Sequence, residues 1–221
     1  MSTSPNNALS EDGLVDLVLA SASPRRRQLL EQLGVKFRVL AADIDETALA
    51  GESPTDYVSR LARQKASAVA ALLADGAEAE THLPVMGADT IVVLGQRLLG
   101  KPVDAADAAQ MLGSLAGREH QVITAVCLMD RERHNIAVVS TDVAFRAMSG
   151  DDIEAYVATG EPFGKAGAYA VQGLAAAFVE RLCGSYTGVV GLPLYETSQL
   201  LADYAVPTEL NRHTLRSQAR S

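Results

Sequence analysis

The sequence predicts a mixed α/β fold, that is, an α/β or α+β protein with one mixed sheet. Early in the chain, short apolar segments alternate with helix patterns, which is typical of strands joined by helical crossovers. Later, two long β-branched segments are joined by a charged turn, which is typical of an antiparallel hairpin. These two patterns together indicate parallel and antiparallel strands in the same chain.

The first elements follow from apolar runs and helix caps. Asp16–Ala20 and Phe37–Leu40 predict short strands on either side of a helix over Arg25–Leu33, whose N-cap is Ser23. A second helix begins at Ser53-Pro54-Thr55-Asp56. The elements expected after it are a helix end before the loop Asp75–His82, a strand over Val85–Leu94 interrupted by Gly87-Ala88-Asp89-Thr90, and a hairpin turn at Gly95-Gln96.

The second half predicts a hairpin flanked by helices. Asp104 caps a helix that ends at Leu115. The strands His120–Leu128 and Ile136–Met148 are joined by the turn Asp130–His134. The last elements expected are a helix from Ser149 to Ala158, a strand over Ala177–Leu182 and a helix from Pro193 through Tyr204.

Length and composition predict one domain. The 221 residues carry no internal repeat or linker, so a single domain is expected over 15–206, after an N-terminal disordered extension (1–14) and before a polar, disordered C-terminal tail (207–221). No long apolar run predicts a transmembrane helix, and the N-terminus lacks an apolar leader. Cys127 and Cys183 lie in apolar runs and are expected to be buried, reduced thiols, so a cytoplasmic protein without membrane contacts is expected.

Charge argues against a nucleic-acid polymer as partner. The net charge is −8, which disfavours binding to a phosphate backbone. The chain has 15 arginines but only four lysines, and three of the four lie in candidate site segments: Lys65, Lys101 and Lys165. Drift in composition accounts for the scarcity of lysine but not for this placement.

Ser21-Ala22-Ser23-Pro24-Arg25-Arg26 is the most informative segment. It joins an apolar strand to a helix start, so free backbone N–H groups, the positive end of the helix, two hydroxyl groups and guanidinium groups point to one place. Such a place binds phosphate, although an ordinary joint with solvated arginines has the same pattern.

Asp89 stands within an apolar strand, where a carboxylate is costly unless it is paired or bound to a metal. It can also simply cap backbone groups at a bend. The acidic segment Asp43-Ile44-Asp45-Glu46 is a solvated loop or, with Asp89, a source of oxygen ligands for Mg²⁺ or Mn²⁺. The loop from Gly164 to Gly173 combines small residues with Lys165, Tyr169 and Gln172, which suits close approach to a ligand.

These segments, in this order, resemble the Maf family of nucleoside triphosphate pyrophosphatases, over about Leu17 to Leu201. The matching motifs are Leu19-Ala20-Ser21-Ala22-Ser23-Pro24-Arg25-Arg26, Arg60-Leu61-Ala62-Arg63-Gln64-Lys65-Ala66, Gly87-Ala88-Asp89-Thr90-Ile91-Val92, Gly100-Lys101-Pro102, Thr141-Asp142-Val143, Lys165-Ala166-Gly167-Ala168-Tyr169, Gln172-Gly173 and Gly184-Ser185-Tyr186. Each motif alone is weakly specific, but the ordered set is highly specific. Gly164 departs from the pattern, which often has an acidic residue there.

The resemblance implies a Maf/ITPase-like fold, with an elongated mixed sheet and two lobes around a deep cleft. It implies a cytoplasmic enzyme that uses a divalent cation, Mg²⁺ or Mn²⁺, to hydrolyse a nucleoside triphosphate to the monophosphate and pyrophosphate. The Gly164–Gly173 loop resembles the branch that acts on dTTP and UTP. Members of the family often form homodimers, so a homodimer is the partner that it implies.

The resemblance also suggests roles for residues. Asp89 is the proton acceptor, a metal ligand or both, and Glu46 is the companion ligand. Arg25, Thr90 and Gln172 determine substrate choice. The triphosphate is expected to contact Ser21, Ser23, Arg25, Arg26, Lys65, Lys101 and Lys165. An amide such as Gln172 satisfies cytosine as well as uracil when it rotates, so Gln172 alone does not exclude CTP.

Two other functions share these motifs. A nucleotide-sensing protein that acts in cell division through a protein partner needs the phosphate-binding residues but not Asp89. A pyrophosphatase for deaminated purine nucleotides has a related fold, but the Ser-x-Ser-Pro-Arg-Arg opening argues against it.

Overall fold

The computed structural model describes residues 15–75 and 83–212. Its elements are β1 (Leu17–Leu19), α1 (Pro24–Gln32), β2 (Phe37–Val39), α2 (Pro54–Asp75), β3 (Val85–Leu94), β4 (Arg97–Leu99), α3 (Ala105–Leu115), β5 (Glu119–Met129), β6 (His134–Phe145), α4 (Gly150–Ala158), the 3₁₀ helices η1 (Ala166–Ala168) and η2 (Leu174–Phe178), β7 (Val179–Cys183), α5 (Tyr186–Val190) and α6 (Leu194–Asp203).

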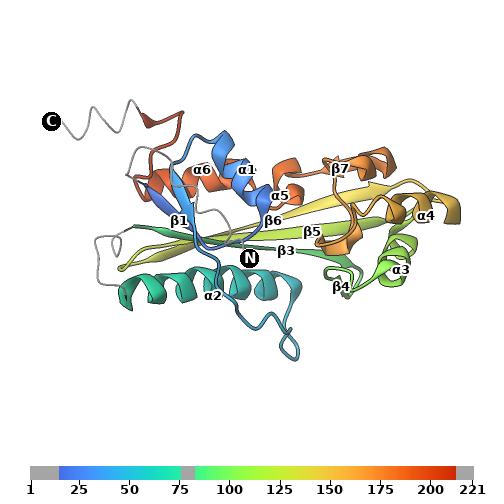
Figure 1. Cartoon of the computed structure of the whole chain (residues 1–221), viewed down its shortest axis with the longest axis horizontal. Coiled ribbons are helices and arrows are strands. Elements are labelled where there is room, and N and C mark those ends of the chain that lie inside the picture. Colours follow the sequence, from blue (N-terminus) through green and yellow to red (C-terminus); the bar gives the residue numbers. More distant parts are fainter. Residues whose placement is uncertain (1–14, 76–82, 213–221) are drawn as a thin grey trace, which may run out of the picture.

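The sheet is mixed, as the sequence predicts. The described strands form one sheet in the order β2-β1-β3-β5-β6-β7, with β4 paired to β3. The pairs β1–β2 and β1–β3 are parallel, and the others are antiparallel. The long strands β3, β5 and β6 make the molecule elongated (Figure 1).

Helices cover both faces of this sheet. In Figure 1, α2 lies along one face, whereas α1, α5 and α6 lie on the other. Strand β3 shows why, since successive side chains point to opposite faces. Met86 and Val92 belong to the core on the α1 and α6 side, and Val85 and Ile91 belong to the core against α2.

Several elements differ from the sequence-based expectation. Strand β3 runs unbroken through Gly87–Thr90, where an interruption is expected. The hairpin at Gly95 adds the short strand β4, and α5 is a helix that the sequence pattern does not reveal. Strand β6 ends at Phe145, before the expected Met148, and its pairing with β7 shifts register between Ala144 and Phe145. Cys127 is buried as expected, but Cys183 is exposed, so the prediction for Cys183 is wrong.

The C-terminal tail begins with ordered contacts. The backbone N–H of Glu209 donates to the carbonyl of Leu33 at 2.8 Å, and Arg212 donates to the carbonyl of Gly34 at 2.7 Å. The last carbonyls of a helix lack partners within it, and the tail supplies partners at the end of α1. The disorder predicted after 207 therefore does not extend to 208–212. The predicted N-terminal extension 1–14, the loop at 76–82 and the remainder of the tail, 213–221, lie outside the described residues.

A close contact between α2 and β3 depends on Gly87. A Cβ atom built at Gly87 would lie 2.1 Å from the carbonyl oxygen of Ala62 and 2.8 Å from the backbone nitrogen of Ala66. No side chain fits between the two backbones, so glycine at this position and alanines on α2 set the distance between helix and strand. This distance determines which α2 side chains reach β3.

We expect Gly87→Ala to lower the free energy of unfolding by about 1–3 kcal/mol, the usual cost of forcing a methyl group into a packed core. Urea unfolding measures it. Gly150→Ala is the control, because a Cβ at Gly150 meets nothing within 4 Å. Equal stability of the two variants would contradict the packing argument.

Candidate active site

A cavity of about 560 Å³ lies where the sheet edge is open. Strand β1 pairs with β3 at Val85 and Met86, and β4 pairs with the same edge of β3 from Val92 onward. On this edge, no described strand pairs with the stretch 87–91 between them, whereas β5 pairs with the same stretch on the opposite edge. Strands β1 and β4 end at the two sides of this gap. The segments that follow them, together with the centre of β3, therefore surround the cavity.

All of the predicted site residues line this cavity: Ser21, Ser23, Arg25, Arg26, Glu46, Lys65, Asp89, Thr90, Lys101, Lys165 and Gln172. Segments that are far apart in the sequence therefore meet at one place. Within the described residues, Asp43 and Asp45 are not part of the lining. Asp45 instead accepts a hydrogen bond from the backbone of Thr47 at 2.9 Å.

The turn between β1 and α1 is organised around Arg26. Ser23 is the N-cap of α1, and its side chain accepts from the backbone N–H of Arg26. The Arg26 guanidinium donates to Ser21 Oγ at 3.1 Å, Thr90 Oγ1 at 3.2 Å and the carbonyl of Gly191 at 2.9 Å. Burial lowers the pKa of this guanidinium. Arg26 thus connects α1, β3 and the end of α5 beside the cavity.

Lys65 joins the two carboxylates of the site. Its ammonium lies 2.6 Å from Glu46 Oε1 and 2.7 Å from Asp89 Oδ1. Asp89 is only 7% exposed and points to the α2 side of β3. Burying an unpaired carboxylate is costly, and the ion pair with Lys65 offsets this cost. Burial acts to raise the pKa of Glu46, but the hydrogen bond and charge of Lys65 outweigh it and hold that pKa below its usual value.

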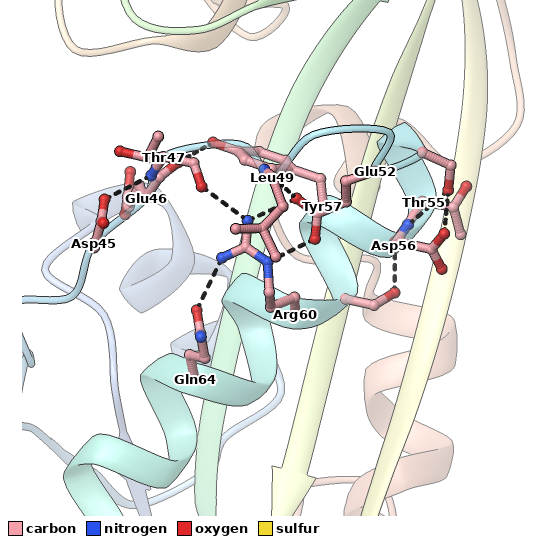
Figure 2. A network of polar contacts seen from close by, with 12 residues as sticks. Asp45, Glu46, Thr47, Leu49, Glu52, Thr55, Asp56, Tyr57, Arg60 and Gln64 are labelled. Atoms are coloured by element: carbon pink, nitrogen blue, oxygen red, sulfur yellow. Dashed lines mark hydrogen bonds and ion pairs between the residues drawn. The ribbon is translucent and has the colours of Figure 1, made fainter.

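The segment that carries Glu46 is held against α2 by Arg60 (Figure 2). The guanidinium donates to Glu52 Oε1 at 2.6 Å, to Glu52 Oε2 at 2.7 Å and to the carbonyl of Thr47 at 3.1 Å. The hydroxyl of Tyr57 donates to the carbonyl of Glu46 itself at 2.9 Å. A segment without helix or strand is therefore fixed at Glu46 and on its C-terminal side.

The loop after α4 brings two more predicted residues to the cavity. The backbone N–H of Gly167 donates to the carbonyl of Gly100, so this loop lies beside Lys101. The Lys165 ammonium donates to the carbonyls of Glu161 and Phe163. Burial and the charge of Arg25 lower the pKa of Lys165.

Glu161 supports the same loop next to Gln172. Its carboxylate accepts from the Tyr156 hydroxyl at 2.9 Å and from the backbone N–H groups of Leu174 at 3.0 Å and Ala175 at 3.2 Å. A Cβ at Gly173 would lie 2.4 Å from this carboxylate, so a side chain next to Gln172 would displace Glu161 from its present position.

Sequence reasoning missed Arg60, Glu161 and Thr124 as supports of the site. Arg60 lies in one of the family motifs, but the motif does not indicate its role. Glu161 precedes the small-residue loop and carries no signal of its own. Thr124 had a usable signal, because it is a polar residue within an apolar strand, as Asp89 is.

The carboxylate pair fits a divalent cation that binds together with phosphate. Among the described residues, no group of three or more His, Cys, Asp or Glu side chains could hold a metal on its own. Mg²⁺ in phosphate-binding sites typically uses one or two carboxylates, and phosphate oxygens and water supply the rest. Glu46 and Asp89 both contact Lys65, so the two carboxylates lie within reach of one cation.

Cationic groups outnumber carboxylates around the cavity. The charged lining residues in the described part of the chain are Arg25, Arg26, Lys65, Lys101 and Lys165 against Glu46 and Asp89. A concave, positively charged site beside a helix N-terminus is of the kind that binds phosphate esters. The fold and the cavity thus describe a mixed α/β protein with a site suited to a phosphorylated small molecule.

Comparison with known proteins gives the family. The sequence model of a family described as Maf-like protein matches residues 16–204, so the chain belongs to the Maf family. It is 53% identical over 190 residues to a dTTP/UTP pyrophosphatase of Xanthomonas campestris pv. campestris, covering 85% of this chain and 98% of the relative. A dTTP/UTP pyrophosphatase of Pectobacterium atrosepticum is 51% identical over 192 residues, covering 87% and 94% of the two chains. In the described residues, no helix is long and apolar enough to span a membrane.

We expect Arg60→Ala to release the segment that carries Glu46. The Leu49 amide, which donates to Glu52 Oε2 at 3.1 Å, should exchange its hydrogen faster, because Glu52 loses the guanidinium that holds its carboxylate in place. Hydrogen exchange measures it. Arg63→Ala, at an exposed position on the same helix, is the control. Unchanged exchange in Arg60→Ala would mean that other contacts hold the segment.

Proposed function

We propose that this protein hydrolyses dTTP and UTP to the nucleoside monophosphate and pyrophosphate. The observation that carries the proposal is the meeting of all the predicted site residues at one cavity, with Asp89 beside a cluster of cations. Relatives that are about half identical over nearly their whole length are named dTTP/UTP pyrophosphatases. The cavity volume of about 560 Å³ suits a ligand of nucleotide size.

In the proposed mechanism, Asp89 accepts the proton of the water that attacks the α-phosphorus. Lys65 holds this carboxylate in place and keeps it beside Glu46. Arg25, Lys101 and Lys165 stabilise the charge that develops on the leaving pyrophosphate. When bound by Glu46, Asp89 and the phosphate oxygens, Mg²⁺ or Mn²⁺ supplies Lewis-acid polarisation of a phosphoryl oxygen.

Base recognition is assigned to Gln172 and Thr90. The Glu161 carboxylate supports the loop that carries Gln172, and Thr90 lies at the floor of the cavity next to Arg26. A site with fixed polar groups discriminates between bases better than an apolar pocket does. A cytoplasmic homodimer is part of the same proposal and rests on the family resemblance.

The products of wild-type turnover test the proposal directly. With dTTP or UTP and Mg²⁺ or Mn²⁺, we expect pyrophosphate and the monophosphate in equal amounts, because attack occurs at the α-phosphorus. Phosphate-specific assays and nucleotide chromatography measure them. Release of orthophosphate and diphosphate would contradict this mechanism, and tight binding without turnover would favour a nucleotide-sensing protein.

We expect Asp89→Asn to lower kcat by ~10²–10⁴-fold, because an amide accepts no proton and is a poor metal ligand. Steady-state hydrolysis of UTP measures it, with thermal unfolding to show that the variant is folded. Asp142→Asn on β6, which bonds Gln121 away from the cavity, is the control and should keep full activity. Activity of Asp89→Asn within a few-fold of the wild type would remove Asp89 from the central role.

A further inference from the structure

A chain of hydrogen bonds leads from the cavity into the core. Arg26 Nη2 donates to Thr90 Oγ1 at 3.2 Å, and Thr90 Oγ1 lies 2.9 Å from Thr124 Oγ1 on the neighbouring strand β5. Thr124 Oγ1 in turn donates to the carbonyl of Gly188 in α5 at 2.8 Å. Thr124 is fully buried and does not line the cavity, whereas Thr90 does.

The number of hydroxyl protons determines which group donates in each hydrogen bond of this chain. A carbonyl only accepts, so the single hydroxyl proton of Thr124 is used on Gly188. The contact between the two threonines therefore uses the proton of Thr90. Arg26 only donates, so it occupies one lone pair of Thr90 Oγ1. Thr90 Oγ1 therefore keeps one free lone pair and has no proton left to donate.

We propose that Thr124 is a positioning residue that makes Thr90 an obligate hydrogen-bond acceptor toward the substrate. The inference rests on the proposed function and deepens it. A group that only accepts requires a donor on the ligand and rejects a second acceptor, because two facing lone pairs leave a desolvated polar atom unpaired.

Pyrimidine chemistry gives this requirement a consequence. Thymine and uracil carry a proton on N3, whereas cytosine has a lone pair there. Thr90 fixed as an acceptor accepts from N3–H and rejects cytosine, which Gln172 alone does not do because its amide can rotate. The ribose or deoxyribose 3′-hydroxyl is the other donor that dTTP and UTP share, and the two sources are separable by experiment.

The test compares Thr124→Val with Thr124→Ser. Valine keeps the shape of threonine but accepts no hydrogen bond, so the proton of Thr90 becomes free to reach an acceptor on the substrate. We expect the ratio of kcat/KM for UTP to that for CTP to fall roughly three- to tenfold, the range for one hydrogen bond. Thr124→Ser keeps the hydroxyl and should keep the wild-type ratio.

A matched control and a second variant guard against a merely structural effect. Thr197→Val on α6 removes another buried hydroxyl, which lies outside the cavity lining, and should leave the ratio unchanged. If Thr124→Val fails to fold, Thr124→Cys replaces it, because a thiol still donates weakly to Gly188 but accepts poorly from Thr90. It should also lower the ratio.

A substrate comparison identifies the donor. If N3–H is the donor, Thr90→Val slows dTTP and its 3′-deoxy analogue by the same factor. If the 3′-hydroxyl is the donor, Thr90→Val slows dTTP but not the analogue, and the acceptor role holds with a different partner.

The outcomes separate this inference from the proposed function. A wild type that hydrolyses neither dTTP nor UTP overturns both. If the wild type hydrolyses UTP but Thr124→Val and Thr124→Ser have the same UTP-to-CTP ratio, only the role of Thr124 is overturned. The exception is the result in which Thr90→Val spares the 3′-deoxy analogue, because the donor is then the 3′-hydroxyl.

Discussion

The open edge of β3 is the constraint on which the site depends. Because β1 and β4 pair with the same edge but leave 87–91 uncovered, that part of β3 is reachable from both faces of the sheet. Asp89 and Thr90 are neighbours and point to opposite faces, yet both line the cavity. Asp89 meets Lys65 from α2, and Thr90 meets Arg26 from α1. One dipeptide therefore joins two helices that lie on different sides of the sheet.

The sequence predicted the strands and helices that bury a clear periodic face, together with the residues that line the cavity. It did not predict that β3 continues through Asp89, because the cost of burying a carboxylate is offset by Lys65, which lies 24 residues away in the chain. The short helix α5 was missed because contacts with β5 and β6, which are distant in the chain, stabilise it rather than local propensity. The supports Arg60 and Glu161 were missed because a sequence pattern does not reveal their partners. Arg60 bonds the side chains of Glu52 and Gln64 and the carbonyl of Thr47, and Glu161 accepts mainly from backbone N–H groups.

The cavity is rich in cations, whereas the whole protein carries a net negative charge. The chain carries a net charge of −8, yet Arg25, Arg26 and Lys165 are gathered at the cavity and burial lowers the pKa of each. Partly desolvated cations interact more strongly with an anion than solvated ones do. Negative charge elsewhere disfavours nonspecific binding to nucleic acid, while the local field selects small polyanions. The scarcity of lysine outside the site is consistent with this division.

In the proposed function, the short helix α5 would connect phosphate binding with base recognition. Its carbonyl at Gly188 accepts from Thr124, and the carbonyl of Gly191 at its C-cap accepts from Arg26. The chain of hydrogen bonds through Thr90 and the separate bond from Arg26 thus end on the same few residues of backbone. Ser185 caps α5 and is bonded to Thr141 on β6, so this backbone is itself fixed to the sheet. A displacement of α5 would shift the guanidinium and the threonine pair together, which makes the geometry of the triphosphate and that of the base interdependent.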